Sequence, residues 1–272
     1  MTETSPSDAA PGALVTGAGQ RIGAAIARAL AADGWRVAVH YNKSADAAAQ
    51  TVAAIVAAGG KAAAVRADLA DPAALPALVM EARAAVGPLG CLVNNAALFA
   101  PDAVAPHSAN AITAPTFDAH MAVNLRAPVL LAQEFAARLD PHAPRGVVVN
   151  LLDQKLANMN PDFASYTLSK AGLETATVLL AQALAPRVRV VGVAPGLTLP
   201  WDEDAAGDRR ERSFEAVHDD TPLGRGSTAE DIAGAVRYLV GADAVTGTTL
   251  VVDGGQHLRP SPGDVMFEPE TE

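Results

Sequence analysis

The chain is poor in cysteine, in aromatic residues and in charge. One Cys among 272 residues excludes an internal disulfide and any Cys-rich metal or iron–sulfur site. The six His residues show neither HExxH nor HxH spacing, which argues against a His-based metal site. A formal net charge of −10 argues against nucleic acid or an anionic membrane as the main partner. We therefore expect a small molecule, and no metal ion, as the partner.

Long apolar segments are absent as well. No stretch reaches the ~18 uninterrupted apolar residues that span a bilayer. The first twelve residues, MTETSPSDAAPG, have no basic start and no apolar run, so they do not form a signal peptide. We therefore expect a cytoplasmic protein. Residues 1–10 and the Pro- and acid-rich residues 259–272 are predicted to be flexible tails.

The chain is nevertheless rich in apolar residues. Hydrophobic residues make up 50% of the sequence, which is enough to bury a sizeable core. At ~150 residues per domain the length suggests one or two domains, but α/β folds often use ~250 residues as one unit. No break in composition marks a second domain, so we predict a single domain over residues 11–258.

Short apolar runs alternate with Ala-rich segments of helical character along this domain. Several runs are continuously apolar, as strands buried on both faces of a parallel sheet must be. The predicted fold is therefore α/β, a single Rossmann-type, doubly wound, mostly parallel seven-stranded sheet with helices on both faces. The predicted strands are 13–16, 36–40, 62–66, 91–94, 146–151, 188–193 and 248–252. The predicted helices are 21–33, 44–58, 72–86, 116–139, 163–185 and 228–240.

One long stretch, residues 197–227, is predicted to be irregular. It contains Trp201 and a charged run over residues 202–212. A loop this long in a compact domain is usually a functional lid or a mobile segment. We predict a substrate loop here, with a solvated insertion as the alternative.

A glycine-rich turn follows the first predicted strand. Residues 16–23 read Thr-Gly-Ala-Gly-Gln-Arg-Ile-Gly, and a helix is predicted to begin at once. Gly17, Gly19 and Gly23 let the backbone turn tightly and approach a pyrophosphate, whose charge is favoured at a helix N-terminus. The strand–turn–helix context favours a dinucleotide-binding turn over an ordinary helix cap.

Five motifs in this order resemble those of the short-chain dehydrogenase/reductase family, over residues 10–258. The turn matches the family's Thr-Gly-x-x-x-Gly-x-Gly, except that Arg21 replaces the second glycine. Pteridine reductases, a branch of the family, often carry Arg there, and its guanidinium can reach a cofactor phosphate or an anionic substrate edge. The other four motifs are Asp68-Leu69, which contacts adenine in the family, Asn94-Asn95-Ala96, Tyr166 to Lys170 as Tyr-x-x-x-Lys, and Pro195-Gly196.

The end of the second predicted strand, residues 40–44, indicates which nicotinamide cofactor binds. An NAD enzyme usually places a carboxylate here for the ribose diol, and that carboxylate repels a 2′-phosphate. No carboxylate occurs before Asp46, whereas Lys43 and Ser44 offer a cation and a hydroxyl that suit the phosphate. The run His-Tyr-x-basic-Ser also resembles the pteridine reductase pattern. The predicted cofactor is NADPH/NADP+.

Tyr166 and Lys170 form the predicted catalytic pair. They are four residues apart on a predicted helix, so both project from one face. A phenol with a pKa of about 10 is a poor acid–base catalyst at neutral pH, and a nearby ammonium is expected to lower that pKa. The resemblance implies that Lys170 also holds the nicotinamide ribose. It further implies that Asn124 kinks a helix and helps to hold a proton-relay water.

The residue thirteen positions before the Tyr distinguishes substrate classes. Most members of the family carry Ser there, whereas this chain has Asp153. A carboxylate would repel the oxyanion that develops in carbonyl reduction, but it suits a heterocycle whose ring nitrogens are protonated. Pteridine reductases and dihydromonapterin reductases resemble this chain in carrying Asp, which implies that Asp153 and Tyr166 deliver a proton to a pterin. Phe99 matches the aromatic that sandwiches the pterin against the nicotinamide in these enzymes.

The predicted function is NADPH-dependent reduction of a dihydropterin or similar nitrogen heterocycle by hydride transfer, with Tyr/Asp proton delivery. Two alternatives stay open: a carbonyl reductase of 3-oxoacyl or sugar substrates, and an NADP-binding regulator without catalysis. The helices predicted at 116–139 and 163–185 resemble the pair that forms a four-helix interface in the family's tetramers, which implies a homotetramer. The predicted catalytic residues are Tyr166, Lys170, Asp153 and Asn124; the cofactor-binding residues are Gly17, Arg21, Ile22, Gly23, His40, Tyr41, Asn42, Lys43, Ser44, Asp68, Leu69, Asn95, Ala96, Lys170, Pro195 and Gly196; and the substrate-binding residues are Phe99, Asp153, Tyr166 and Arg21.

Overall fold

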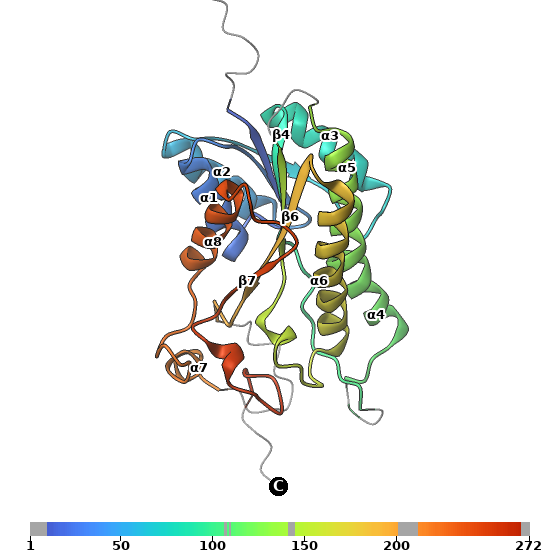
Figure 1. The fold of residues 1–272 in the computed structure, drawn as a ribbon, viewed down its shortest axis with the longest axis vertical. Helices are drawn as coiled ribbons and strands as arrows, with labels where there is room; N and C mark the ends of the chain where they lie inside the picture. The colour runs from blue at the N-terminus through green and yellow to red at the C-terminus, as the bar shows by residue number, and fades with distance from the viewer. Residues whose placement is uncertain (1–9, 106–107, 109, 141–144, 201–211, 268–272) are drawn as a thin grey trace, which may run out of the picture.

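Seven parallel strands form one sheet with helices on both faces, which confirms the predicted α/β class (Figure 1). The computed structural model describes residues 10–105, 108, 110–140, 145–200 and 212–267. The strand order is β3-β2-β1-β4-β5-β6-β7, so the order reverses between β1 and β4. The strands are β1 (Gly12–Val15), β2 (Arg36–Tyr41), β3 (Lys61–Arg66), β4 (Leu89–Asn94), β5 (Gly146–Leu151), β6 (Val188–Pro195) and β7 (Thr249–Val252).

The helices form two layers, one on each face of the sheet (Figure 1). One layer contains α1 (Arg21–Ala32), α2 (Ala45–Ala57) and α8 (Ala229–Gly241), and the other contains α3 (Ala74–Val86), α5 (Ala127–Ala137) and α6 (Ala164–Leu184). Side chains alternate between the faces of a strand, and β1 shows the consequence. Ala13 and Val15 pack in the core under α1 and α8, whereas Leu14 packs in the core under α3 and α5. Within the described ranges, no helix has the length and apolar composition that crossing a bilayer requires.

The helix predicted over 116–139 is interrupted. It is divided into α4 (Ala114–Met121), a π-helical turn at Ala122–Arg126, and α5. Pro128 has no backbone N–H, so the regular bond back to the carbonyl of Asn124 cannot form and the α-helical ladder is broken there. The interruption turns the Asn124 side chain toward the end of β4, where it bonds the backbone of Leu98.

The stretch 197–227 is not wholly irregular, which corrects the sequence prediction. Residues Phe214–Asp219 form a short helix, α7, in this stretch. Its N-cap is Ser213, whose hydroxyl accepts a hydrogen bond from the backbone N–H of Ala216 at 3.1 Å. Trp201 and residues 202–211, which we predicted to be part of a substrate loop, lie outside the described residues.

The C-terminal segment, defined here as residues 259–267, also differs from the prediction of a flexible tail. Met266 and Phe267 are 2% and 5% exposed, and they pack with Phe163 and Tyr166 in one cluster. The polar composition of residues 259–264 concealed this apolar pair, whose burial holds the segment against the domain. Residues 268–272, and residues 1–9 of the predicted N-terminal tail, lie outside the described residues.

Candidate active site

A cavity of about 700 Å³ lies beside the carboxyl ends of β4, β5 and β6. In a doubly wound parallel sheet, ligands bind outside the carboxyl ends of the strands, where the strand order reverses. The volume falls within the range of small-molecule sites in proteins. The predicted site residues in its wall are Arg21, Ile22, Asn95, Phe99, Asp153, Tyr166, Lys170, Pro195 and Gly196.

The glycine-rich turn is shaped as the sequence predicts. Gly17 has a φ of +62°, which favours glycine. A Cβ on Gly23 would lie 2.2 Å from the Gly17 carbonyl oxygen, so only glycine allows α1 to start this close to the turn. Asn95 Nδ2 donates to the carbonyl oxygens of Thr16 and Gly17, at 2.8 and 3.1 Å. These bonds tie the turn after β1 to the end of β4.

His40, which the sequence analysis predicted to bind the cofactor, contacts the backbone of this turn through its ring. Its ring is buried: Nδ1 accepts from the backbone N–H of Gly17 at 3.1 Å, and Nε2 lies 3.2 Å from the Ala67 carbonyl oxygen, to which it donates in this tautomer. Burial lowers the pKa of His40 to about 4, so the ring is neutral at physiological pH. His40 therefore positions the turn and carries no charge for a phosphate.

Arg21 occupies the place of a family glycine in a backbone conformation that glycine favours. Its φ is +54°, which costs a residue with a Cβ about 1 kcal/mol or more. The guanidinium lies in the cavity wall, where Nη2 donates to the carbonyl oxygen of Pro200 at 3.0 Å. Arg21 therefore links the glycine-rich turn to the segment that follows β6.

Residues 40–44, Asp68 and Leu69 lie apart from this cavity, at the ends of β2 and β3. Asn42 Nδ2 donates to Asp68 Oδ1 at 3.3 Å, and Leu69 is buried in the core. Lys43 and Ser44 are exposed. Arg66, which the sequence analysis missed, donates from Nε to the carbonyl oxygen of Asn42 at 3.2 Å. The strand register pairs Tyr41 of β2 with Arg66 of β3, so Arg66 adds a second cation to this end of the sheet. Its place as the last residue of the third predicted strand was the signal that could have identified it.

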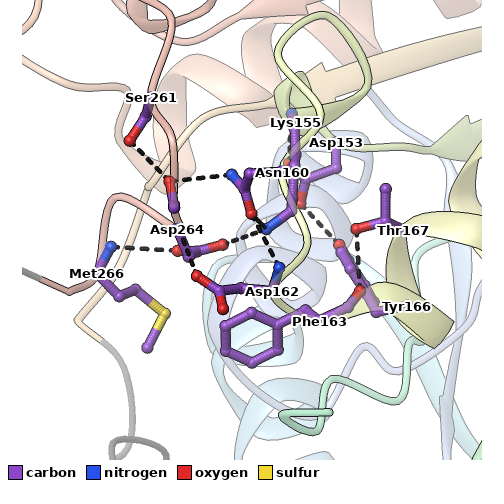
Figure 2. A network of polar contacts seen from close by, with 11 residues as sticks. Asp153, Lys155, Asn160, Asp162, Phe163, Tyr166, Thr167, Ser261, Asp264 and Met266 are labelled. Carbon is purple, nitrogen blue, oxygen red and sulfur yellow. Dashed lines mark hydrogen bonds and ion pairs between the residues drawn. The ribbon is translucent and has the colours of Figure 1, made fainter. Parts of the chain in front are cut away.

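Three of the four residues predicted to catalyse, Asp153, Tyr166 and Lys170, line the cavity, and Figure 2 shows Asp153 beside Tyr166. Tyr166 Oη donates to Asp153 Oδ2 at 2.8 Å. Lys170, one turn further along α6, donates from Nζ to the carbonyl oxygen of Leu151 at 2.6 Å. Tyr166 and Lys170 are buried, at 6% and 3% exposed. The structure thus brings Asp153, Tyr166 and Lys170 together, as the sequence analysis expected.

The electrostatics of this pair differ from the expectation. Burial raises the pKa of Asp153, although N–H and O–H donors from Lys155 and Tyr166 oppose the shift. Burial, and then the negative charge of Asp153, raise the pKa of Tyr166 well above its usual value. On balance the pKa of Tyr166 is therefore raised, whereas the sequence analysis expected it to be lowered by Lys170. The phenol is held as a neutral proton donor, while burial lowers the pKa of Lys170 to about 8.

Asn124 and Phe99 both contact α6 close to the catalytic pair. Asn124 is fully buried, and its Nδ2 donates to the carbonyl oxygen of Leu98 at 2.9 Å and to Ser169 Oγ at 3.0 Å. The predicted kink is present, and its role in holding a relay water stays a prediction. Phe99 stacks on Phe163, with ring centroids 4.3 Å apart, and meets the Tyr166 ring edge-on at 4.8 Å.

Two buried glutamines, both missed in the sequence, add polar groups to the cavity wall. Gln154 Oε1 and Gln256 Nε2 are buried with no hydrogen-bond partner among the described residues. Gln256 Oε1 accepts from the backbone N–H of Leu197 at 3.0 Å, which fixes the amide and leaves Nε2 as the unused donor. Buried polar groups of this kind usually have partners, so a bound ligand is the natural source of them.

Comparison with known proteins shows the family. A family model described as enoyl-(acyl carrier protein) reductase matches residues 17–257. The structure of the FolM alternative dihydrofolate reductase 1 from Brucella canis, complexed with NADP, is 41% identical, with a TM-score of 0.82 and coverage of 93% of this chain and 96% of that one. A short-chain dehydrogenase from Burkholderia cenocepacia, also in complex with NADP, is 35% identical, with a TM-score of 0.79 and coverage of 93% and 99%.

Relatives with other activities match at similar levels. The 3-oxoacyl-[acyl-carrier-protein] reductase of Synechocystis sp. is 34% identical over 248 residues, which cover 89% of this chain and 95% of that one. The relatives therefore agree on the family while their substrates differ. The chain belongs to the short-chain dehydrogenase/reductase family, a family of oxidoreductases, and its 41% identity to the FolM structure fits the pteridine reductase branch.

Proposed function

We propose that this protein is an NADPH-dependent reductase of a dihydropterin or a similar nitrogen heterocycle. The observation that carries the proposal is the 2.8 Å hydrogen bond from Tyr166 Oη to Asp153 Oδ2, in a cavity where Tyr166 is 6% exposed and Asp153 is partly buried. A carboxyl group in this place is unfavourable beside a developing oxyanion. Beside a ring nitrogen that must gain a proton it is favourable, because its raised pKa favours the protonated form that can supply one.

The residues present fit a nicotinamide dinucleotide phosphate. The turn at Gly17–Gly23 offers a backbone that can approach a pyrophosphate. Lys43, Ser44 and Arg66 offer two cations and a hydroxyl for a 2′-phosphate, and Asp46, the first carboxylate after β2, lies within α2. NADP in the Brucella and Burkholderia structures supports this choice. The remaining predicted contacts, from Tyr41, Asn42 and the Asn95-Ala96 and Pro195-Gly196 segments, belong to the same proposal.

The chemistry divides between cofactor and protein. The reduced nicotinamide supplies the hydride. Tyr166 donates its phenolic proton to the substrate, and the Asp153 carboxyl group, already hydrogen-bonded to that phenol, returns a proton to it. Lys170 orients the nicotinamide ribose, and its positive charge offsets the negative charge that remains on the Asp–Tyr pair. Because Asp153 and Tyr166 are coupled, their apparent pKa values belong to the pair.

Three wall residues suit a flat heterocycle with polar edges. Phe99 presents the exposed part of its ring at the cavity, where a π-system can stack. Gln154 Oε1 can accept from a ring N–H or an amino group, and Gln256 Nε2 can donate to a ring nitrogen or carbonyl. Arg21 is proposed to contact a cofactor phosphate or an anionic edge of the substrate.

A panel of dihydropteridines and ketones with NADPH tests the function. Loss of the nicotinamide absorbance with a dihydropteridine, faster than with any ketone, is the expected result. Reduction of 3-oxoacyl or sugar ketones without any dihydropteridine would establish the carbonyl reductase alternative, which the 3-oxoacyl reductase relatives favour. Absence of turnover with tight NADPH binding would establish the non-catalytic regulator.

A homotetramer is proposed as the assembly. The outer face of α6 exposes Val178 and Leu179, and isologous packing of such a face would bury them. Light scattering at micromolar concentration checks this, and a monomer contradicts it.

A further inference from the structure

The C-terminal segment forms part of the same cavity that holds the catalytic pair. Asp264, Val265 and Met266 line the cavity together with Asp153 and Tyr166, although about a hundred residues separate the two groups in the sequence. Figure 2 shows Asp264 facing Lys155, beside the Asp153–Tyr166 hydrogen bond.

A buried ion pair anchors the segment at this point. Lys155 Nζ lies 2.7 Å from Asp264 Oδ2, and the two side chains are 5% and 11% exposed. Nζ also donates to Asn160 Oδ1 at 2.6 Å. The backbone N–H of Lys155 donates to Asp153 Oδ1 at 2.8 Å, so one residue contacts both the segment and the reacting carboxyl group.

The segment has further attachments on both sides of Asp264. The backbone N–H of Asp264 donates to Asp162 Oδ2 at 2.8 Å, and Asn160 Nδ2 donates to the Gly263 carbonyl oxygen at 3.0 Å. Met266 N–H donates to Asp264 Oδ1 at 3.1 Å. These contacts fix the backbone of the segment against residues 160–162, the loop that leads into α6.

The segment reaches the substrate-facing aromatic residues through Phe163. Phe267 stacks parallel to Phe163 with ring centroids 6.1 Å apart, and Phe163 in turn stacks on Phe99. Lys155 Nζ lies 5.4 Å from the Phe163 ring centroid. A displacement of the segment therefore changes the position of the Phe99 ring at the cavity.

We propose that residues 259–267 form one wall of the substrate site, and that Lys155 and Asp264 are positioning residues that hold this wall and the Phe163–Phe99 stack. The pair contributes to recognition of the substrate rather than to cofactor binding. A buried ion pair is weak evidence for stability alone, because its desolvation offsets much of its attraction. The Lys155–Asp264 pair joins the C-terminal segment to a residue whose backbone N–H bonds Asp153, and this position gives the pair a role in shaping the substrate site. The inference rests on the proposed reductase function only for the choice of substrate.

The charge of Asp264 also provides a second readout. The titratable groups around Asp153 are Tyr166 and Lys170 from α6, Lys155 from the turn that follows Asp153, and Asp264 from the C-terminal segment. The negative charge of Asp264 raises the pKa of both Asp153 and Tyr166. Removing this charge should therefore lower the pH at which the rate falls, which a purely structural contact would not do.

Asp264→Asn is the first test, because Asn keeps the size of the side chain but not its charge. The expected result is a substrate KM raised about tenfold or more, equivalent to about 1.4 kcal/mol, with kcat changed less and the NADPH Kd unchanged. The alkaline limb of the kcat/KM profile should move to lower pH. Lys155→Met should raise KM similarly, and the double variant should be no worse than either single one, since both remove the same pair.

The control is Asp33→Asn, which removes the ion pair between Asp33, at the end of α1, and Arg237 of α8, whose Nε lies 2.6 Å from Asp33 Oδ2. It joins distant parts of the chain outside the site, and KM should not change. Asp264→Glu, which keeps the charge, should restore most of the affinity. If Asp264→Asn does not fold, Phe267→Ala, which keeps the ion pair but removes the apolar anchor of the wall, should raise KM instead.

All variants are measured on whichever dihydropteridine or ketone the enzyme reduces fastest. Reduction of ketones alone would reject the proposed function and leave the test of the wall intact. An unchanged KM and an unchanged pH profile in Asp264→Asn, on that substrate, would show that the segment is not part of the substrate site.

Discussion

Replacement of Asp153 by Ser is the perturbation that separates the two substrate classes. The Asp153 carboxyl group accepts hydrogen bonds from the Tyr166 hydroxyl and from the backbone N–H of Lys155, each at 2.8 Å. These bonds hold the carboxyl group in place without the substrate. A serine hydroxyl is shorter and has a pKa far above neutral, so it cannot return a proton to Tyr166 in the same way. It can, however, polarise a ketone, as the usual family serine is expected to do.

The magnitude follows from the role. Loss of a general acid–base group costs ~10²–10⁴ in rate, or about 2.7–5.5 kcal/mol of barrier. Dihydropteridine reduction should fall by this factor, while ketone reduction should stay constant or increase. Because the protonated pair is needed, the wild-type kcat should fall as pH rises through the apparent pKa of the pair, and Asp153→Ser should change that limb.

The assay is the decrease in nicotinamide absorbance at saturating NADPH, from pH 5 to 10, with Asp153→Asn as a matched variant. Asn keeps the acceptor oxygen but cannot carry the proton, so it separates hydrogen bonding from proton delivery. Unchanged dihydropteridine turnover in both variants would refute the reasoning about Asp153.

Three further predictions concern other parts of the site. Tyr166→Phe should nearly abolish turnover and leave the NADPH Kd within about threefold, because the phenol acts in chemistry; a stopped-flow and fluorescence comparison checks this. Lys43→Asp should reduce the preference for NADPH over NADH by roughly tenfold or more, and Arg66→Ala should reduce it further, as titration of both cofactors will show. The folded-state pKa of His40 is lowered to about 4 from 6.5, so the unfolded chain takes up the proton first as pH falls. Stability should therefore decrease from pH 6.5 toward pH 4 by about 3 kcal/mol at most through this residue, and urea unfolding of His40→Gln should show a smaller decrease.

Local patterns in the sequence predicted most of the fold, because the reasons for it are local. β1, β5 and β6 are buried along their whole length and are mostly apolar, which made them easy to predict, and the partly exposed edge strands β3 and β7 also overlap predicted strands. The left-handed backbone at Gly17 favours glycine, and a Cβ on Gly23 would clash with the Gly17 carbonyl oxygen, so the turn can be recognised from its glycines. The helix break at Asn124 was expected from the resemblance, and Pro128 supplies its physical cause.

The site was predictable where its spacing lies within one element, and less so where it joins several. Tyr166 and Lys170 lie on one helix, so their spacing predicted that they lie together, and the resemblance to the family added Asp153, which lies outside this helix. The pKa of Tyr166 was predicted in the wrong direction, because burial and the charge of Asp153 depend on packing that no spacing reveals.

Only the tertiary structure decided the role of residues far apart in the chain. Lys155 and Asp264 carry no motif, and 109 positions separate them, yet they meet in a buried pair at the cavity. The ring of His40 contacts the backbone of Gly17 and Ala67, which only the packing of β2 beside the turn could show. The C-terminal segment was predicted to be a flexible tail, but Met266 and Phe267 at its end are buried against Phe163 and Tyr166. Sequence patterns report each segment's own preferences, whereas the wall of a cavity depends on which segments the folded chain brings into contact.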